Sequence, residues 1–237
     1  MHRFFVNQLN TITKITGEDV KHIIRVLRLQ NGDTVTLCDG QGHECEAAIT
    51  GIENNTVIFH CGDIVFSRTE PNTQITLFQG LPKSGKMELI IQKCVEIGIH
   101  EITPILTERC VVQPKESFSA RIERWQKVSE EAAKQSRRGY IPKITSLCKL
   151  EDLDFCTYDL VLVAYENEEN TSLKSIIKSF SGKKAAIIIG PEGGFAESEI
   201  KILNDKGAVC ISLGPRILRT ETAGMTLLAQ FLYEVES

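Results

Sequence analysis

The chain of 237 residues is long enough for one large or two small domains, and its hydrophobic content of 42% excludes a disordered protein. A formal net charge of −4 argues against a protein that coats nucleic acid over its whole surface, so any RNA contact must come from local basic patches. No apolar run approaches the roughly 20 residues of a membrane span, and residues 1–5 lack the apolar core of a signal peptide. We therefore expect a cytoplasmic protein that does not enter a membrane.

The eight cysteines form no C-x-x-C pair, and without an export signal we expect them to be reduced thiols. Cys38, His43, Cys45, His60 and Cys61 lie close in the sequence, but their spacing matches no common zinc motif. We expect ordinary half-buried side chains at these positions and no metal site.

Residues 1 to about 70 have the pattern of a small β-rich module. Strand-like runs separated by turn sequences rich in Gly, Asp and Asn predict a short barrel. Apolar residues at helical spacing after Gly17 predict a short helix that ends near Leu29. The predicted strands cover residues 34–38, 45–52 and 56–61.

Basic residues in this module are candidates for RNA contact. Lys21, Arg25 and Arg28 recur at i, i+4 and i+7, so they share one face of the predicted helix. That face is either solvated or a stripe that contacts phosphates. Arg3 precedes two phenylalanines, a combination that suits base stacking, although the phenylalanines would also fit the start of a strand with Arg3 merely exposed.

A polar connector, residues 67–73, marks the predicted domain boundary. Beyond it, apolar strands alternate with amphipathic helices, which predicts an α/β domain with a mostly parallel sheet. The predicted strands are 75–78, 102–106, 160–164, 185–189 and 209–213, and the predicted helices are 86–97, 120–137, 173–180, 197–206 and 223–235.

The segment from Gln135 to Tyr140 is the most basic local feature. Arg137 and Arg138 fit the end of a helix, where positive charge is favoured and Gly139 suits the position after the last helical residue. The functional alternative is that these arginines bind RNA phosphates or stabilise charge near a pocket. Trp125 lies at core spacing on the same helix.

Two loops follow two predicted strands and have unusual chemistry. Residues 190–195 read G-P-E-G-G-F, and the glycines allow a ligand to approach the main chain closely. The stretch 213–224 holds two arginines, a threonine and a glutamate between residues 216 and 221, in a loop that needs none of them for its structure. Thr220 or Thr222 fits the cap of the last helix. Because ligands bind at the carboxyl ends of strands in open α/β sheets, we expect one composite pocket.

A rival motif lies at the start of the second domain. Residues 80–86 match G-x-x-x-x-G-K between a strand and a helix, which is the context of a phosphate-binding loop. Met87 stands where Ser or Thr would hold Mg²⁺, so a nucleotide-hydrolysing protein remains only an alternative. A non-catalytic RNA-binding protein is a second alternative, but it leaves the two loops unexplained.

The two loop sequences together resemble the signature of the ribosomal small-subunit methyltransferase E family, within the SPOUT superfamily of RNA methyltransferases. Further fitting segments are His22-x-x-Arg25-Val-Leu-Arg28, residues 86–98, Ile102-Thr-Pro104, Glu108-Arg-Cys110, Trp125 and residues 135–142. The resemblance implies a PUA-like RNA-binding domain at 1–70 and a SPOUT methyltransferase domain at 74–237. It also implies a trefoil knot, a homodimer, S-adenosyl-L-methionine as cofactor, and methylation of uridine N3 in 16S ribosomal RNA.

We assign candidate roles to individual residues on this basis. Glu221 is the candidate base that removes the N3 proton, and Arg219, Arg3 and Arg138 are candidates to stabilise the resulting anion. The expected RNA contacts are Arg3, Lys21, Arg25, Arg28, Arg137 and Arg138. The expected cofactor contacts are Gly190, Pro191, Glu192, Gly193, Gly194, Leu213, Gly214, Ile217, Leu218 and Thr220, with Ile217 and Leu218 covering the adenine.

Overall fold

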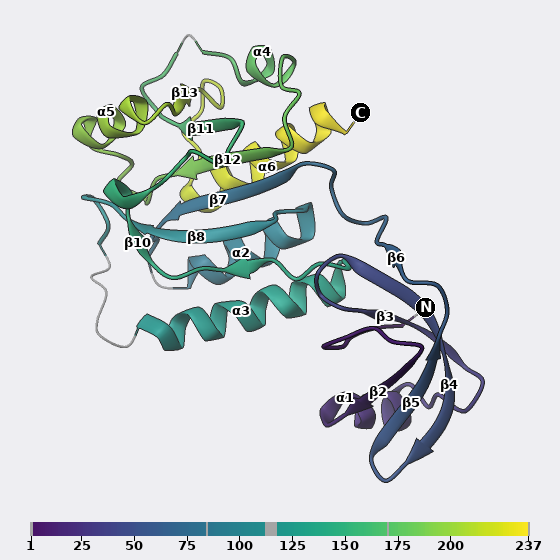
Figure 1. The fold of residues 1–237 in the computed structure, drawn as a ribbon. Helices are drawn as coiled ribbons and strands as arrows, with labels where there is room; N and C mark the ends of the chain where they lie inside the picture. Colours follow the sequence, from purple (N-terminus) through teal and green to yellow (C-terminus); the bar gives the residue numbers. More distant parts are fainter. Residues whose placement is uncertain (1, 84, 112–117, 170, 237) are drawn as a thin grey trace. The chain divides into compact units, whose positions relative to one another are not determined.

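The computed structural model describes residues 2–83, 85–111, 118–169 and 171–236 (Figure 1). The chain divides into two compact units, residues 1–70 with 133–141 and residues 71–132 with 142–237. Residues 133–141, which the sequence assigns to the second domain, group with the first unit. The reason lies in long-range hydrogen bonds: Glu70 accepts the N–H of Gly139 at 2.9 Å, and Gly40 accepts that of Ile141 at 3.0 Å.

The first unit is a sheet of short strands in the order β1-β3-β4-β5-β2, with β6 paired to β4. Side chains alternate between the core and solvent, as a sheet buried on one face requires. The core contains Val35, Leu37, Val57 and Phe59, all fully buried. The strands are β1 Arg3–Phe5, β2 Ile12–Thr16, β3 Thr34–Cys38, β4 His43–Glu53, β5 Thr56–Cys61 and β6 Val65–Phe66.

The single helix expected between Gly17 and Leu29 is wrong in its length and geometry. The α-helix α1 covers only Glu18–Lys21, and a π-helical turn follows at His22–Val26, closed by the hydrogen bond from Leu27 N to His22 O at 2.9 Å. Because a π turn holds more residues than an α turn, the spacing i, i+4, i+7 no longer defines one face. Arg28 lies outside the helix in the left-handed region, with φ of 54°.

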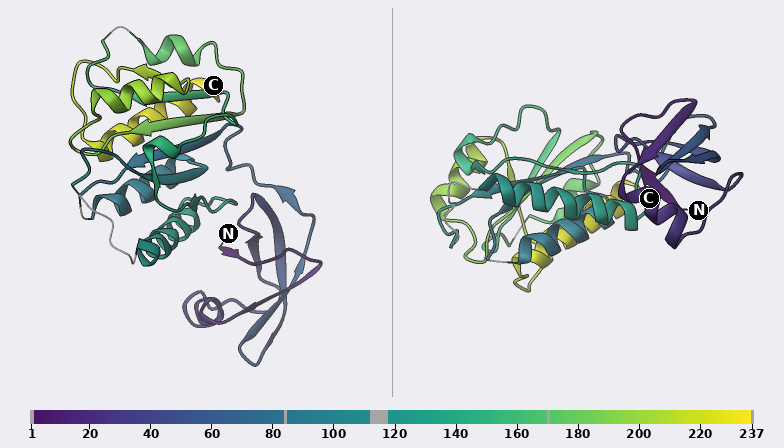
Figure 2. Two further views of the ribbon diagram at one scale, coloured as in Figure 1. Left: turned by 60° about the vertical axis from the view of Figure 1, so that its left-hand side comes forward. Right: turned by 90° about the horizontal axis from the view of Figure 1, so that it is seen from below.

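The second unit is a parallel sheet in the order β10-β8-β7-β12-β11-β13, with β9 paired to β8. Its central strands are continuous apolar runs because both faces are covered. α5 packs Ile200 and Leu203 on one face, and α2 and α6 lie together with α6 against β7 and β12 (Figure 2). The strands are β7 Gln74–Gly80, β8 Glu101–Leu106, β9 Lys143–Ile144, β10 Cys148–Lys149, β11 Leu160–Ala164, β12 Lys184–Ile189 and β13 Val209–Ile211.

The helices are α2 Lys86–Ile97, α3 Phe118–Gln135, α4 Leu173–Ile177, α5 Glu197–Asp205 and α6 Thr220–Val235, with a short 3-10 turn at Leu150–Asp152. Trp125 on α3 is buried, as its spacing predicts. α3 ends differently from the prediction, because Arg137 and not Gly139 adopts positive φ, at 59°. Gly139 is instead required by close packing, since a Cβ there would lie 2.6 Å from the Cβ of Ser67. No helix within the described residues is long and apolar enough to cross a membrane.

Candidate active site

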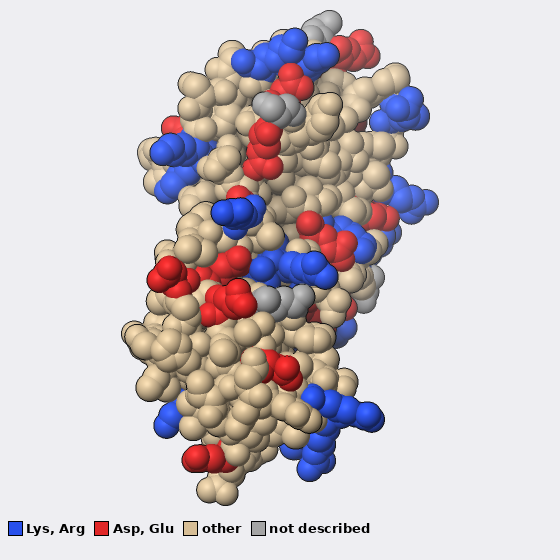
Figure 3. Space-filling view, turned by 90° about the vertical axis from the view of Figure 1, so that its right-hand side faces the viewer, with Lys and Arg blue, Asp and Glu red and all other residues tan. Residues whose placement is uncertain are grey.

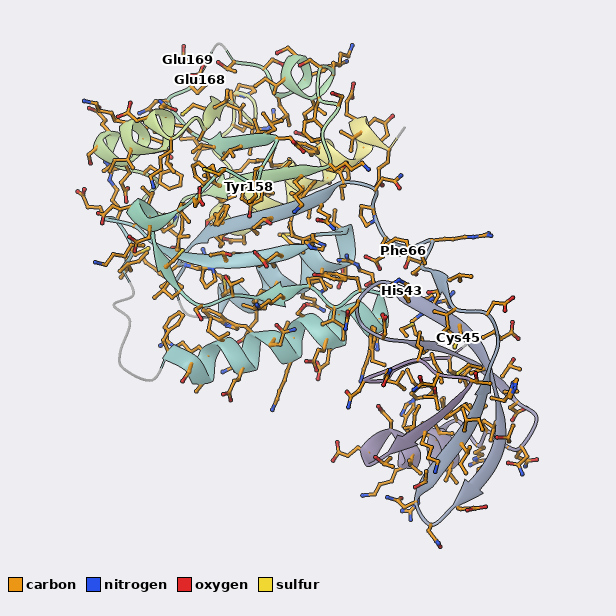
Figure 4. The ribbon with its side chains drawn as sticks, viewed as in Figure 1. His43, Cys45, Phe66, Tyr158, Glu168 and Glu169 are labelled. Carbon is orange, nitrogen blue, oxygen red and sulfur yellow. The ribbon has the colours of Figure 1, made fainter. Side chains whose placement is uncertain are left out.

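The carboxyl ends of β11, β12 and β13 meet at one edge of the second unit, and the loops that follow them enclose a cleft. The cleft has a smaller chamber of ≈ 290 Å³ and an adjoining larger chamber of ≈ 560 Å³. The two chambers share the lining residues Ala164, Tyr165, Glu166, Ile217, Leu218 and Ala223. The larger chamber reaches Glu168 and Glu169, on the segment between β11 and α4 (Figure 4).

Most of the expected cofactor contacts come together here. The smaller chamber is lined by Gly190, Pro191, Glu192, Gly194, Ile217, Leu218, Arg219 and Thr220, and the larger one by Leu213 and Gly214. Gly193 lines neither chamber, and its carbonyl oxygen accepts a hydrogen bond from Arg109 Nη1 at 3.0 Å. The two loops singled out in the sequence therefore form one site.

A buried hydrogen-bond chain joins these two loops. The Thr220 hydroxyl donates to the carbonyl oxygen of Gly190 at 2.7 Å and accepts from Gln79 Nε2 at 2.9 Å. The expected capping role of Thr220 is wrong, because α6 begins at Thr220 itself with Arg219 as the preceding residue. The hydroxyl instead fixes the start of α6 against the glycine loop.

The glycine loop, residues 190–195, is folded tightly on itself and against its neighbours. Gly194 has φ of 66°, and a Cβ there would lie 2.8 Å from Glu166 Oε1. A Cβ on Gly190 would lie 3.2 Å from the carbonyl carbon of Gly194. Glycine is thus favoured at 194 by its backbone conformation, and the Glu166 carboxylate lies directly beside this loop, where an added Cβ would displace it.

Three charged residues form a cluster, of which Lys86 and Glu192 line the smaller chamber and Glu221 lines neither chamber. Lys86 Nζ lies 3.1 Å from Glu192 Oε1 and 3.0 Å from Glu221 Oε2. Burial acts to raise the pKa of Glu221, but hydrogen bonds from its own backbone N–H and from Lys86, with the charge of Arg219, outweigh it and lower the pKa. The pKa of Glu192 is also lowered, because its backbone N–H, Lys86 and the Lys83 N–H outweigh the same effect of burial. Both carboxylates are therefore ionised at neutral pH.

Residues of the segment 80–86 bind the carboxylate of Glu192, and this contact is an alternative to the role of a phosphate-binding loop. The backbone N–H of Lys83 donates to the Glu192 carboxylate at 3.1 and 3.2 Å, so a protein carboxylate takes the position of an anionic ligand. A Cβ on Gly80 would lie 2.6 Å from the backbone nitrogen of Pro191, so this glycine serves close packing against the glycine loop. Ser84 lies outside the described residues.

Two of the candidate catalytic arginines belong to the first unit and line neither chamber of the cleft. Arg3 donates to Glu44 Oε2 at 2.7 Å. Arg138 is 3% exposed and binds Glu70 Oε2 through Nε at 3.1 Å and Nη2 at 2.6 Å. Their charges are matched by carboxylates of the same unit.

The expected RNA contacts Lys21, Arg25, Arg28 and Arg137 are exposed. On the face shown in Figure 3, basic and acidic side chains are interspersed. This agrees with local basic contacts and not with a broad cationic surface.

Among the cysteines and histidines between residues 38 and 61, Cys38, His43 and Cys61 contact other side chains of the first unit. His43 and Cys45 lie on β4 (Figure 4), and His43 Nδ1 pairs with Asp39 Oδ2 at 2.9 Å. Burial raises the pKa of the Cys38 thiol to about 12. Among the described residues, no three His, Cys, Asp or Glu side chains gather as a metal site requires.

Four residues of the site are not predicted from the sequence: Gln79, Lys86, Arg109 and Glu166. In the sequence, Lys86 stands out within the phosphate-loop motif and at the start of the family segment 86–98, and Arg109 lies within the family segment Glu108-Arg-Cys110, but neither receives a role at the site. Glu166 follows the predicted strand 160–164 by two residues. The position of Glu166 after a strand end is a usable signal, because strand ends carry ligand contacts in such sheets. Gln79 gives no signal, since its partner Thr220 is distant in sequence.

Comparison with known proteins agrees with this architecture. Residues 69–232 match the model of an RNA methyltransferase domain, and residues 15–60 match that of an RNA methyltransferase PUA domain. The chain is 34% identical over 235 residues to the ribosomal RNA small subunit methyltransferase E of Bacillus subtilis, covering 94% of this chain and 90% of that protein. It is 33% identical over 237 residues to the enzyme of the same name from Synechocystis, covering 96% and 74% of the two chains.

Two similar solved structures contain S-adenosyl methionine. One is a ribosomal RNA small subunit methyltransferase E from Neisseria gonorrhoeae, with a TM-score of 0.85, 27% identity, and coverage of 98% of this chain and 97% of that one. The other is a putative methyltransferase from Legionella pneumophila, with a TM-score of 0.82, 29% identity, and coverage of 98% and 96%. The chain belongs to the ribosomal RNA small subunit methyltransferase E family and carries its RNA methyltransferase and PUA domains.

Proposed function

We propose that the protein methylates N3 of a uridine in 16S ribosomal RNA of the small subunit, with S-adenosyl-L-methionine as methyl donor. The observation that carries this proposal is the meeting of the glycine loop and the loop 213–224 around one cleft, in a chain of this family. The cofactor in two structures of similar proteins supports the choice of donor.

The residues of the cleft fit such a cofactor. The glycine loop offers main chain at close range, and the apolar side chains of Ile217 and Leu218 suit a purine ring. The Glu166 carboxylate suits a cationic group or ribose hydroxyls. The bound cofactor supplies an electrophilic methyl group on a sulfonium, so the protein has mainly to place the two reactants in line.

The N3 proton of uridine must leave before or during methyl transfer. We assign the removal of this proton to Glu221, in the first turn of α6, as the candidate base. Its lowered pKa reduces the driving force for proton uptake, which favours a second route in which Arg219 stabilises the uridine anion. Arg219 is exposed and lines the smaller chamber, whereas Arg3 and Arg138 are paired with carboxylates in the first unit.

We further propose that residues 1–70 bind RNA and residues 74–237 perform the transfer. The exposed side chains of Lys21, Arg25 and Arg28 support phosphate contacts by the first of these regions. Arg137 is an exposed candidate for the same role.

We also propose that the protein forms a homodimer and that its cofactor domain is knotted, because the family resemblance implies both. Exposed apolar side chains support an interface. Ile217, which lines both chambers, is 86% exposed, and Tyr233, which lines a neighbouring cavity together with Leu213 and Gly214, is 77% exposed. Light scattering of the purified protein measures the oligomeric state, and a monomer at micromolar concentration would contradict the dimer.

The function is tested with small subunits and free 16S RNA that lack the modification. The protein and labelled cofactor should transfer a methyl group to one uridine, found by mass spectrometry of nuclease fragments. Calorimetry with the cofactor and with ATP, in parallel, separates the alternatives, since ATP binding without cofactor binding would favour a nucleotide-hydrolysing protein.

A further inference from the structure

Lys86 is the first residue of α2 and follows Gly85, whose φ of 86° turns the chain sharply. A cation at this end of a helix opposes the helix dipole, which favours negative charge at the amino terminus. The position is therefore unfavourable for lysine unless other groups compensate. Glu192 and Glu221 provide this compensation, at 3.1 and 3.0 Å from Nζ.

The two carboxylates come from different elements of the cleft. Glu192 belongs to the glycine loop after β12, and Glu221 belongs to the first turn of α6. The side chains of Lys86, Glu192 and Glu221 are 27%, 23% and 15% exposed, so solvent screens the cluster only incompletely. Without the ammonium group, two like charges would face each other across a partly buried space and repel.

The backbone of the preceding segment belongs to the same arrangement. The N–H of Lys83 donates to both oxygens of Glu192, at 3.1 and 3.2 Å. Glu192 is therefore held from two sides, by a backbone donor and by the ammonium group. Glu221 is held by the ammonium group at a point one residue beyond Thr220, which binds the carbonyl oxygen of Gly190.

We infer that Lys86 is a positioning residue that sets the separation of the glycine loop and the start of α6, and so the shape of the cofactor cleft. The inference rests on the proposed function for the identity of the ligand. The neutral bond between Thr220 and Gly190 joins these elements in the interior, and the Lys86 cluster joins them at the rim. Loss of the rim contact is expected to widen the cleft without unfolding the domain.

The experiment compares Lys86→Met with Lys93→Met. Lys93 lies on the same helix and pairs with Glu96 on that helix at 2.9 Å, outside the residues that line the cleft, so it is a matched control. Calorimetric titration with S-adenosyl methionine should show about ten-fold weaker binding by Lys86→Met and less than about two-fold change in Lys93→Met. Lys86→Arg keeps the charge and should restore most of the affinity.

Two further readouts separate positioning by charge from a general structural effect. In Lys86→Met the pKa of both carboxylates should rise, because the neighbouring ammonium group is lost. As pH falls through the raised pKa, protonation removes the repulsion, so the loss of cofactor affinity relative to wild type should shrink. The affinity of Lys93→Met relative to wild type should not change with pH. The double variant Lys86→Met with Glu192→Gln should lose less affinity than the product of the two single losses, because the repelling charge is gone.

The possible failures are distinct. A wild-type protein that does not bind the cofactor would remove the proposed function and this inference together. A wild-type protein that binds, with Lys86→Met indistinguishable from Lys93→Met at every pH, would overturn the inference alone. Additive losses in the double variant, or no recovery in Lys86→Arg, would also overturn it.

Discussion

The hydroxyl of Thr220 donates to the carbonyl oxygen of Gly190 at 2.7 Å, and this bond joins the two loops that form the cleft. The same hydroxyl accepts from Gln79, which is fully buried. Because a hydroxyl has one hydrogen to donate, the geometry requires Gln79 to present its NH₂ group to Thr220. The three residues are therefore one unit with a fixed direction of donation.

Thr220→Val removes this hydroxyl while keeping the shape of the side chain. The buried carbonyl oxygen of Gly190 and the amide of Gln79 each lose a partner, so the free energy of unfolding should fall by about 1–3 kcal/mol. Cofactor affinity should fall as well. Denaturant unfolding and calorimetry check both effects. Thr222→Val is the control, since Thr222 is exposed on the same helix, and equal losses in the two variants would contradict the assignment.

Gly194→Ala should weaken cofactor binding more than it weakens the fold. The added Cβ meets the Glu166 carboxylate at 2.8 Å, and the φ of 66° costs about 1–2 kcal/mol for a residue with a side chain. Gly207→Ala isolates the conformational cost, because Gly207 has φ of 93° with nothing within 4 Å of the new Cβ. Melting temperatures of the two variants should be similar, and only Gly194→Ala should lose cofactor affinity.

Gly193→Val, which the sequence alone suggests as a test of close cofactor approach, acts differently in this structure. Its Cβ would lie 3.0 Å from the Cβ of Arg109, and its backbone has no positive φ. The obstruction falls on the protein and not in the lined cleft. For this reason Gly194 is the sharper probe of the glycine loop.

The sequence predicts those elements whose local apolar pattern is clear. β11 and α2 have the predicted bounds, because an uninterrupted apolar run and a clear helical period leave little choice. For β1, with three residues, the sequence leaves open both base stacking by Arg3 beside the phenylalanines and the start of a strand. The local sequence cannot decide because the strand forms only by pairing with β3. The π turn after α1 is not predicted either, because the spacing of apolar residues in the sequence matches the period of an α-helix.

The site divides in the same way. Both loops are predicted, because glycines and charges at strand ends are a local signal. The cluster of Lys86 with Glu192 and Glu221 is not, since its members lie in three separate segments and only the folded chain brings them together. The local sequence around Lys86, residues 80–86, instead matches a loop that would bind a phosphate group. The ion pair of Arg138 with Glu70 is not predicted either, because the two residues are distant in sequence.

Arg138→Met should destabilise the protein by about 3–5 kcal/mol, since it leaves the buried Glu70 carboxylate without its cation. Arg124→Met is the control, because Arg124 is 71% exposed in its pair with Glu88, where a change of about 0–1 kcal/mol is expected. Denaturant unfolding measures both. If Arg138→Met keeps its stability and loses only methylation rate, the arginine acts on the uridine anion and not in the fold.

Replacing Lys21, Arg25 and Arg28 together by Ala should weaken RNA binding and flatten its salt dependence. Each phosphate contact contributes about 0.7–0.9 to the slope of log affinity against log salt, so the slope should fall by roughly 2–3. Cofactor affinity should not change. A triple Ala variant of the exposed Lys178, Lys183 and Lys201 makes the same change in charge, and an equal effect on the slope would return the first set to an ordinary solvated surface.

Glu221→Gln separates the two routes for the N3 proton. If Glu221 is the base, the single-turnover methylation rate should fall by ~10²–10⁴ with RNA affinity kept, and raising the pH should restore some of it because solvent then shares the deprotonation. The lowered pKa of the carboxyl means that it is ionised at neutral pH and is protonated only as pH falls through that lowered value. The wild-type rate should therefore lose its contribution from Glu221 only in acid.

Variants of Arg219 test the second route, stabilisation of the uridine anion, by the same single-turnover measurement. If the cation stabilises the uridine anion, Arg219→Lys should keep some of the rate and Arg219→Ala much less, while Glu221→Gln changes the rate little. Because Glu221→Gln also removes a charge from the Lys86 cluster, cofactor affinity is measured for each variant and the rate is taken at saturation. A Glu221→Gln protein with the wild-type rate and pH profile at saturating cofactor would exclude Glu221 as the base and leave anion stabilisation by Arg219, with proton transfer to solvent.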